Sequence, residues 1–238
     1  MAWDLTDRPV EAIPLELHLA QRHLAVGTPV EVVVAREVGA DRLVDLVVGA
    51  GFEVRRAPSG GGRGPLVVIA SRARTLADSV APDLRLLVCG VNPSLYSADA
   101  GVGYARPGNR FWPAALATGV ATVDRDPIAA LAGGMGMTDF AKRATRTAAE
   151  VTRDEYLAGF ARVTRLVEWL RPGAVCFVGL SGWRTVVDRH AVAGLQPSPI
   201  GGRPAYVMPS TSGLNARTPL ADLVDHLEVA WALVETIG

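Results

Sequence analysis

Four short apolar segments, each followed by a polar loop, constrain the fold of this chain more than any other feature. The first, LRLLVCGV at 84–91, shows no polar alternation, which is typical of a strand buried on both faces of a parallel sheet. Helical spacing of apolar residues is found at 153–170 and at 219–236, with Thr218 as the expected N-cap of the second helix. Strands that alternate with helices predict an α/β fold with a short, mainly parallel central sheet between two helical layers. The other three segments are GMGMTDF at 134–140, AVCFVGL at 174–180 and AYVMPS at 205–210.

The first third of the chain has its own pattern. VEVVVA at 30–35, FEVRRA at 52–57 and PLVVIASRA at 65–73 predict strands, and the apolar spacing at 41–49 predicts a helix. The glycine-rich segment SGGGRG at 59–64 would need a helix after it to hold a phosphate, but a strand follows, so we expect a hairpin loop. We therefore predict a small α/β extension of unknown role over residues 1–75, followed by a larger domain over 76–238.

Composition excludes several classes of protein. The formal net charge is zero, which disfavours a non-specific nucleic-acid coat protein. No apolar run approaches the roughly 18 residues of a membrane span, and the acidic start of the chain does not resemble a signal peptide, so we expect a cytoplasmic protein. Cys89 and Cys176 lie inside apolar runs and the histidines are scattered, so we predict no metal site and no cofactor.

The loops that follow the predicted strands contain amides, hydroxyls, arginines and aromatic residues, but few acids. In a parallel α/β fold these loops meet at the carboxyl edge of the sheet, where ligands bind. Asp99 and Asp139 are the only acids in the three most polar loops, and neither has an evident partner. The paired carboxylates of an ordinary glycosidase and the nucleophile elbow of a serine hydrolase are both missing from these loops.

Three of these segments resemble the mismatch-specific uracil-DNA and thymine-DNA glycosylase family. VNPSLYSADAGVGYARPGNRFW at 91–112 is similar to the first family motif without a gap, GMTDFAKRAT at 136–145 to its middle segment, and MPSTSGLNAR at 208–217 to its second motif. The resemblance covers roughly residues 75–238 and implies the three-layer α/β/α fold of uracil-DNA glycosylases. One departure is Ser94, which stands where the family usually has glycine.

The resemblance also implies roles for individual residues. In isolation, an Asn-Pro after a strand indicates only a turn. In the motif, Asn92 positions the attacking water and Thr138 helps to hold it. Tyr104 stacks on the flipped base, whereas Phe111 and Trp112 are expected to be core residues. The remaining base pocket is assigned to Val91, Pro93, Ser94 and Ser212. The DNA contacts are assigned to Arg106, Arg110, Gly213, Leu214, Asn215 and Arg217, with Leu214 as the apolar wedge rather than a helix staple.

The predicted activity is that of a monofunctional DNA glycosylase in base excision repair. It would flip uracil out of a mispair with guanine in double-stranded DNA and hydrolyse its N-glycosidic bond, with thymine and modified pyrimidines as further candidate substrates. An amide cannot deprotonate water well, so slow turnover is expected. Alternatives are a glycosylase for another lesion such as hypoxanthine and a non-catalytic lesion-binding module, although the presence of Asn92 argues against the latter. A lyase would need an amine, and we do not expect Lys142, the only lysine, to supply it. We expect a monomer that associates with the nucleoid.

Overall fold

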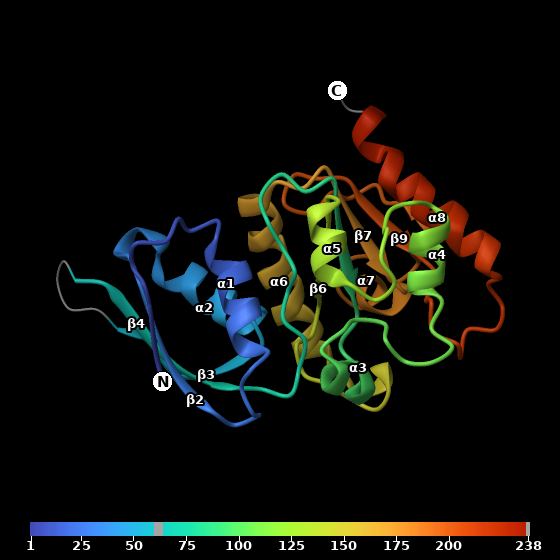
Figure 1. The fold of residues 1–238 in the computed structure, drawn as a ribbon. Coiled ribbons are helices and arrows are strands. Elements are labelled where there is room, and N and C mark those ends of the chain that lie inside the picture. The colour runs from blue at the N-terminus through green and yellow to red at the C-terminus, as the bar shows by residue number, and fades with distance from the viewer. Residues whose placement is uncertain (60–63, 237–238) are drawn as a thin grey trace.

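The computed structural model describes residues 1–59 and 64–236 and contains two β-sheets (Figure 1). The N-terminal sheet has the order β1-β2-β4-β3, in which β1 is parallel to β2 and the other neighbours are antiparallel. We refer to this sheet and its helices as the N-terminal unit. Its elements are β1 (Ala2–Leu5), α1 (Ile13–Gln21), β2 (Pro29–Val34), the 3-10 helix η1 (Arg36–Val38), α2 (Ala40–Gly49), β3 (Phe52–Ser59) and β4 (Leu66–Arg72).

The apolar face of this sheet explains why these segments fold together. Val30, Val32 and Val34 alternate along β2 toward a core that also contains Leu43 and Leu46 of α2. The predicted strands and the predicted helix of this region are confirmed, whereas β1 and α1 were not predicted. The hairpin prediction falls mainly on residues 60–63, which lie outside the described residues, but the strands on either side are paired and antiparallel.

The second sheet has the order β6-β5-β7-β9-β8, and all its pairs are parallel except β8 with β9. Its strands are β5 (Leu86–Gly90), β6 (Met135–Asp139), β7 (Ala174–Val178), β8 (Gly194–Leu195) and β9 (Ala205–Met208). The four apolar segments identified in the sequence form β5, β6, β7 and β9. They therefore make the central, mainly parallel part of the sheet, as predicted.

Helices cover both faces of this sheet. The helical elements are α3 (Leu95–Ala100), α4 (Phe111–Ala117), α5 (Pro127–Ala132), η2 (Ala148–Glu150), α6 (Arg153–Leu170), α7 (Leu180–Val186), α8 (Leu220–Ala232) and η3 (Leu233–Thr236). Leu87 and Cys89 of β5 pack in the core that includes α6 and α7, whereas Leu86 and Val88 pack in the core that includes α4 and α8. Both faces of the strand are therefore buried, and the fold is the predicted three-layer α/β/α arrangement.

The start of α8 differs from the prediction. Thr218 was expected to cap this helix, but Pro219 is the N-cap residue and no side chain caps it. The Thr218 hydroxyl accepts a hydrogen bond from Asn215, 3.1 Å away, and its carbonyl accepts one from Arg110. Thr218 therefore belongs to the loop before the helix.

The N-terminal unit packs against α6, on the side of the second sheet opposite α8 (Figure 1). Trp169 of α6 packs against the core of the N-terminal unit, with the guanidinium of Arg42 5.1 Å from the centre of its ring. Arg165 of α6 forms two hydrogen bonds to Asp45 of α2, at 2.7 and 2.8 Å. None of the described helices is long and apolar enough to cross a membrane.

Candidate active site

The carboxyl ends of β5, β6 and β9 bring the three motif segments together. Beyond the end of β6 the chain continues alongside the loop after β5. Phe140 N donates to Gly90 O at 2.9 Å, and Thr145 N donates to Pro93 O at 3.1 Å. The loop after β9 joins them through Arg110 N, which donates to Thr211 O at 2.9 Å. Segments that lie far apart in the sequence thus form one polar edge of the sheet, as the sequence pattern predicts.

The side chain of Asn92 is held in a single orientation at this edge. Its Nδ2 donates to the carbonyl of Arg143 at 3.0 Å and to Thr145 Oγ1 at 2.7 Å. Thr145 gives its own hydroxyl hydrogen to Thr147 O at 2.7 Å, so its oxygen must act as an acceptor toward Asn92. Both amide hydrogens of Asn92 therefore have acceptors in the protein. Its Oδ1, which has no partner among the described residues, remains available to accept a hydrogen bond from water or substrate.

Ser94, the departure from the family motif, caps the helix that follows Asn92. It is the N-cap residue of α3, and its Oγ accepts a hydrogen bond from Ser97 N at 3.1 Å. Its φ of −71° is ordinary for any residue, so this backbone does not require glycine. Pro93 is buried beside it, whereas Val91 is half-buried. The hydroxyl of Ser94 therefore stabilises the start of α3.

Tyr104 lies with one ring face against Phe111, at a centroid distance of 4.2 Å. Its φ of 58° is in the left-handed region, which is uncommon for a residue other than glycine and often marks a functional segment. Phe111 and Trp112 are fully buried, as predicted for core residues, and Trp112 Nε1 donates to Gly103 O at 2.8 Å. The hydroxyl of Tyr104 is buried and has no partner in the described structure. Burial, together with the charge of Asp139, raises its pKa well above the ordinary value.

Asp139 lies at the end of β6, close to the Tyr104 hydroxyl. A Cβ placed on Gly90 would collide with the carboxylate of Asp139 and would lie 3.0 Å from the hydroxyl of Tyr104, so a larger residue at position 90 would displace these two side chains. The Asp139 carboxylate forms no hydrogen bond to another described residue. Burial raises its pKa to about 6, against the opposing effect of Lys142. A group that titrates near neutral pH at a strand end is a candidate for a functional role.

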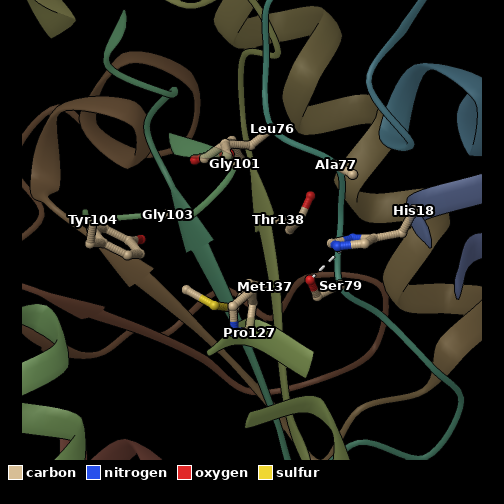
Figure 2. Close-up of a pocket in the computed structure, with 11 residues that line it drawn as sticks. His18, Leu76, Ala77, Ser79, Gly101, Gly103, Tyr104, Pro127, Met137 and Thr138 are labelled. Carbon is tan, nitrogen blue, oxygen red and sulfur yellow. Dashed lines mark hydrogen bonds between the residues drawn. The ribbon is translucent and has the colours of Figure 1, made fainter. Parts of the chain in front are cut away.

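Asp139, Tyr104 and Thr138 line a cavity of about 30 Å³ (Figure 2). The opposite wall is formed by His18 of α1, whose ring points toward Ser79 and Thr138. His18 is buried, which lowers the pKa of its imidazole. The other lining residues are Leu76, Ala77, Gly101, Gly103, Pro127 and Met137. The N-terminal unit therefore contributes to the wall of a cavity at the edge of the candidate site.

Thr138 has a different environment from the one its predicted role requires. Its hydroxyl points to the α6 side of the sheet, where it donates to Asp78 Oδ1 at 2.8 Å and accepts from Arg162 at 2.9 Å. The side chain that contacts Asn92 is Thr145. A water-holding role for Thr138 thus stays a prediction, while its contacts place it in a buried ionic cluster behind the site.

The loop between β9 and α8 is held by Arg110. Its guanidinium donates to the carbonyls of Asn215, at 2.6 Å, Ser212, at 3.2 Å, and Thr218. These contacts give Arg110 a structural function within the protein. Arg110 was predicted to contact DNA, and with its guanidinium bonded to three carbonyls a contact with a DNA phosphate stays a prediction. Asn215 is engaged in the same way, because its Nδ2 donates to Ser210 O at 2.8 Å.

Leu214 projects from the tip of this loop with 82% of its surface exposed. Gly213 before it approaches the loop that ends the first motif so closely that an added Cβ would lie 2.9 Å from Gly108 O. Arg106 and Arg217 are also exposed, and their side chains make no hydrogen bond or ion pair with other described residues. The described surface near this edge therefore combines one exposed apolar side chain with two uncommitted cations.

Sequence reasoning missed several residues of this arrangement. Thr145 was quoted in a motif without a role, and Asp139 was noted only as an isolated acid. No local signal marked His18 or Asp78, because the contacts of these residues join distant parts of the chain. Among residues 1–59 and 64–236 no group of three His, Cys, Asp or Glu side chains is placed to hold a metal ion.

A comparison with known families agrees with the geometry of this edge. The family description "Uracil DNA glycosylase superfamily" matches residues 77–235, more than half of the chain, and includes all three motif segments. Members of this superfamily are DNA glycosylases, hydrolases of base excision repair, so the match indicates DNA glycosylase activity. Residues 1–76 lie outside it. The chain belongs to the uracil DNA glycosylase superfamily.

Proposed function

We propose that this protein is a monofunctional glycosylase that removes uracil mispaired with guanine from double-stranded DNA. The observation that carries the proposal is the orientation of Asn92, whose Nδ2 is committed to Arg143 O and Thr145 Oγ1 while Oδ1 is a free acceptor. An acceptor of this kind can orient a water toward the anomeric carbon without removing its proton. Such chemistry suits a base that leaves as a stabilised anion, as uracil does, and it predicts slow turnover.

The other residues of the edge support this reaction. The face of Tyr104 that is not packed on Phe111 can stack on a flipped base, which is worth about 1–3 kcal/mol without reading base identity. Leu214, which is 82% exposed, can fill the space that the base leaves in the duplex. Extrusion costs least for a mispaired base, so part of the preference for a mismatch comes from the DNA itself.

The position of Lys142 favours hydrolysis over lyase chemistry. Its Nζ lies 2.8 Å from Asp78 Oδ1, and only 11% of its side chain is exposed. An amine that donates to a buried carboxylate is held by that contact and is not free to attack the sugar. Lys142 is the only lysine of the chain. The proposed enzyme therefore leaves an intact abasic site.

Asp139 favours a second candidate substrate. Its carboxyl group lines the cavity beside Tyr104 and makes no hydrogen bond to a described residue. When ionised it can only accept hydrogen bonds, so it suits a base edge that presents an N–H group, such as N1–H of hypoxanthine or N3–H of a pyrimidine. Excision of hypoxanthine is therefore the alternative that most needs to be measured.

A panel of labelled duplexes tests the proposal. The panel contains U·G, T·G, U·A and hypoxanthine·T pairs and single-stranded uracil, and each reaction is split before treatment with alkali. We expect strand breaks with U·G only after alkali, and less product from U·A. Breaks without alkali would indicate a lyase, and preferential cleavage of hypoxanthine would favour the second candidate. No abasic sites on any duplex would overturn the proposal.

A further inference from the structure

The segment that joins the two sheets passes along the edge strand of the second sheet. Ser79 and Met137 of β6 exchange both backbone hydrogen bonds, at 2.9 and 2.8 Å. The residue before Ser79 is Asp78, whose carboxylate is buried under α6. The joining segment is thus an ordered part of the molecule that lies against the strand ending at the candidate site.

Asp78 is the centre of a buried ionic cluster. Its two carboxylate oxygens accept hydrogen bonds from Lys142 Nζ at 2.8 Å, from Arg162 at 2.7 Å and from Thr138 at 2.8 Å. Burial opposes ionisation of Asp78, but the two cations and their hydrogen bonds outweigh it and keep its pKa below the ordinary value. The carboxylate therefore remains charged and fixes the side chain of Lys142.

The N-terminal unit holds the backbone of Asp78 from the other side. Asp78 N donates to Gly49 O at the end of α2 at 2.8 Å, and the ring of His18 in α1 makes a 2.9 Å hydrogen bond to Asp78 O. An added Cβ on Gly49 would lie 2.5 Å from Oδ2 of Asp78, so the lack of a side chain at Gly49 leaves room for this carboxylate. The position of Asp78 is thus set by the N-terminal unit.

Lys142 is held at two points by this joining segment. Asp78 binds its ammonium group, and the Thr75 hydroxyl donates to its backbone carbonyl. The next residue, Arg143, provides the carbonyl that accepts a hydrogen bond from Asn92. Contacts therefore run without a break from the N-terminal unit through Asp78, Thr75 and Lys142 to the backbone that orients the Asn92 amide.

We propose that Asp78, Thr75 and Lys142 are positioning residues, through which the N-terminal unit fixes Asn92 in its catalytic orientation. The inference rests on the proposed function of Asn92. It assigns a role to residues 1–75, which lie outside the family match. Displacement of a catalytic group by about 1 Å can cost 10²-fold in rate, so a modest shift of the backbone at Arg143 is sufficient for a large effect.

A matched contact separates positioning from simple attachment. Asp45 of α2 and Arg165 of α6 also join the N-terminal unit to the second sheet, through two hydrogen bonds. Neither side chain makes a hydrogen bond or an ion pair with residues 139–145 in the described structure. Asp45→Asn therefore weakens the attachment and keeps every hydrogen bond of the route to Asn92.

The experiment compares Lys142→Met and Thr75→Val with Asp45→Asn. Asp78→Asn is a poor first choice because it would leave two buried cations without a counter-charge and could prevent folding. Lys142→Met keeps the Asp78–Arg162 pair. The measurements are the single-turnover rate on a U·G duplex, the Kd for a duplex with a non-cleavable lesion, and the NMR signals of the Asn92 side-chain amide, assigned with Asn92→Ala.

We expect Lys142→Met and Thr75→Val to slow single-turnover cleavage by about tenfold or more. The Kd for DNA should change by less than about threefold, because the groups that contact DNA are untouched. Lys142→Arg should restore part of the rate. In the two slow variants the signals of the Asn92 side-chain amide should shift, and its hydrogens should exchange faster with solvent. Both properties should stay unchanged in Asp45→Asn.

Two results would overturn the inference. One is an unchanged rate and unchanged Asn92 signals in Lys142→Met. The other is an equal loss of rate in Asp45→Asn, which would mean that attachment alone matters. The NMR measurement does not depend on turnover, so it can refute the positioning contact even if the wild-type protein cleaves no duplex. A wild-type protein that cleaves no duplex would contradict the proposed function instead.

Discussion

At the scale of single residues, the proposed reaction depends on which end of the Asn92 amide faces the protein. Three acceptors surround Nδ2: the carbonyls of Arg143 and Pro93, and the hydroxyl of Thr145, whose hydrogen is already donated. A carboxylate at this position would place an oxygen against the carbonyl of Arg143 and would be repelled by it. The surroundings of Asn92 therefore stabilise an amide side chain and disfavour a carboxylate.

Asn92→Asp tests this directly. Although aspartate is the stronger base, we expect the variant to cleave a U·G duplex more slowly than the wild type at pH 7.5, because its carboxylate cannot make the contacts that orient Asn92. Single-turnover kinetics on the same duplex measure the effect, with circular dichroism to check the fold. A variant faster than the wild type would show that basicity limits the rate and that orientation does not.

Asp139 gives a prediction for pH dependence. Its pKa is raised from 3.8 to about 6, so between these values the folded protein retains a proton that the unfolded chain has lost. Stability must therefore fall as the pH rises through this window, by on the order of 1 kcal/mol between pH 5 and pH 7.5 from this group. Urea unfolding of the wild type and of Asp139→Asn at both pH values isolates the contribution. An equal pH dependence in the two proteins would contradict the assignment.

Residue-level chemistry was only partly predictable from the sequence. Asn92 and Tyr104 stand in an uninterrupted motif, so a local pattern was enough to single them out. The cluster around Asp78 could not be found in this way, because its hydrogen-bond partners are 60, 64 and 84 positions away in the chain. The contacts of Arg110 with three carbonyls could not be predicted either, because an arginine in a DNA-binding motif looks the same in sequence whether it contacts a phosphate or the protein backbone.

At the scale of elements, the loop between β9 and α8 presents Leu214 on a fixed support. Arg110, at the start of α4, binds the loop from outside, Asn215 donates to Ser210 within it, and Gly213 packs against Gly108. The apolar side chain is thus exposed while its backbone is held. Such an arrangement suits insertion into a duplex, because the loop is already ordered and loses little conformational entropy on binding.

Leu214→Ala should therefore weaken DNA binding without affecting the fold. We expect the Kd for a duplex with a non-cleavable lesion to rise by about tenfold or more, because an apolar wedge stabilises the extruded state. Fluorescence anisotropy gives the Kd, and thermal unfolding should be nearly unchanged. Val26→Ala is the control, since Val26 is 62% exposed but lies in the N-terminal unit. Equal affinity of the Leu214 and Val26 variants would refute the wedge.

The elements themselves were largely predictable where burial dictates the pattern. The strands β5, β7 and β9 are fully buried, and their apolar runs were recognised in the sequence. The strand β1 and the helix α1 were missed for the opposite reason. β1 has only 4 residues with alternate exposure, and α1 lacks a side-chain cap and buries His18 and Gln21, which are not apolar.

At the scale of the whole molecule, the two sheets share contacts that make them one structural unit. Trp169 of α6 packs in the N-terminal core, and Asp78 connects α2, β6 and α6. We expect a single cooperative unfolding transition by calorimetry, with a ratio of calorimetric to van't Hoff enthalpy near 1. Two resolved transitions would show that the N-terminal unit is an independent domain and would weaken its proposed influence on Asn92.

Single-turnover cleavage of a U·G duplex by the wild type and by Asn92→Ala tests whether Asn92 orients the water that cleaves the glycosidic bond. Removal of one key polar group at a reacting centre costs about 10²–10³-fold in other enzymes. We therefore predict that Asn92→Ala binds the duplex with nearly unchanged affinity and forms abasic sites at least about 10²-fold more slowly. Wild-type cleavage by the folded variant would contradict the account.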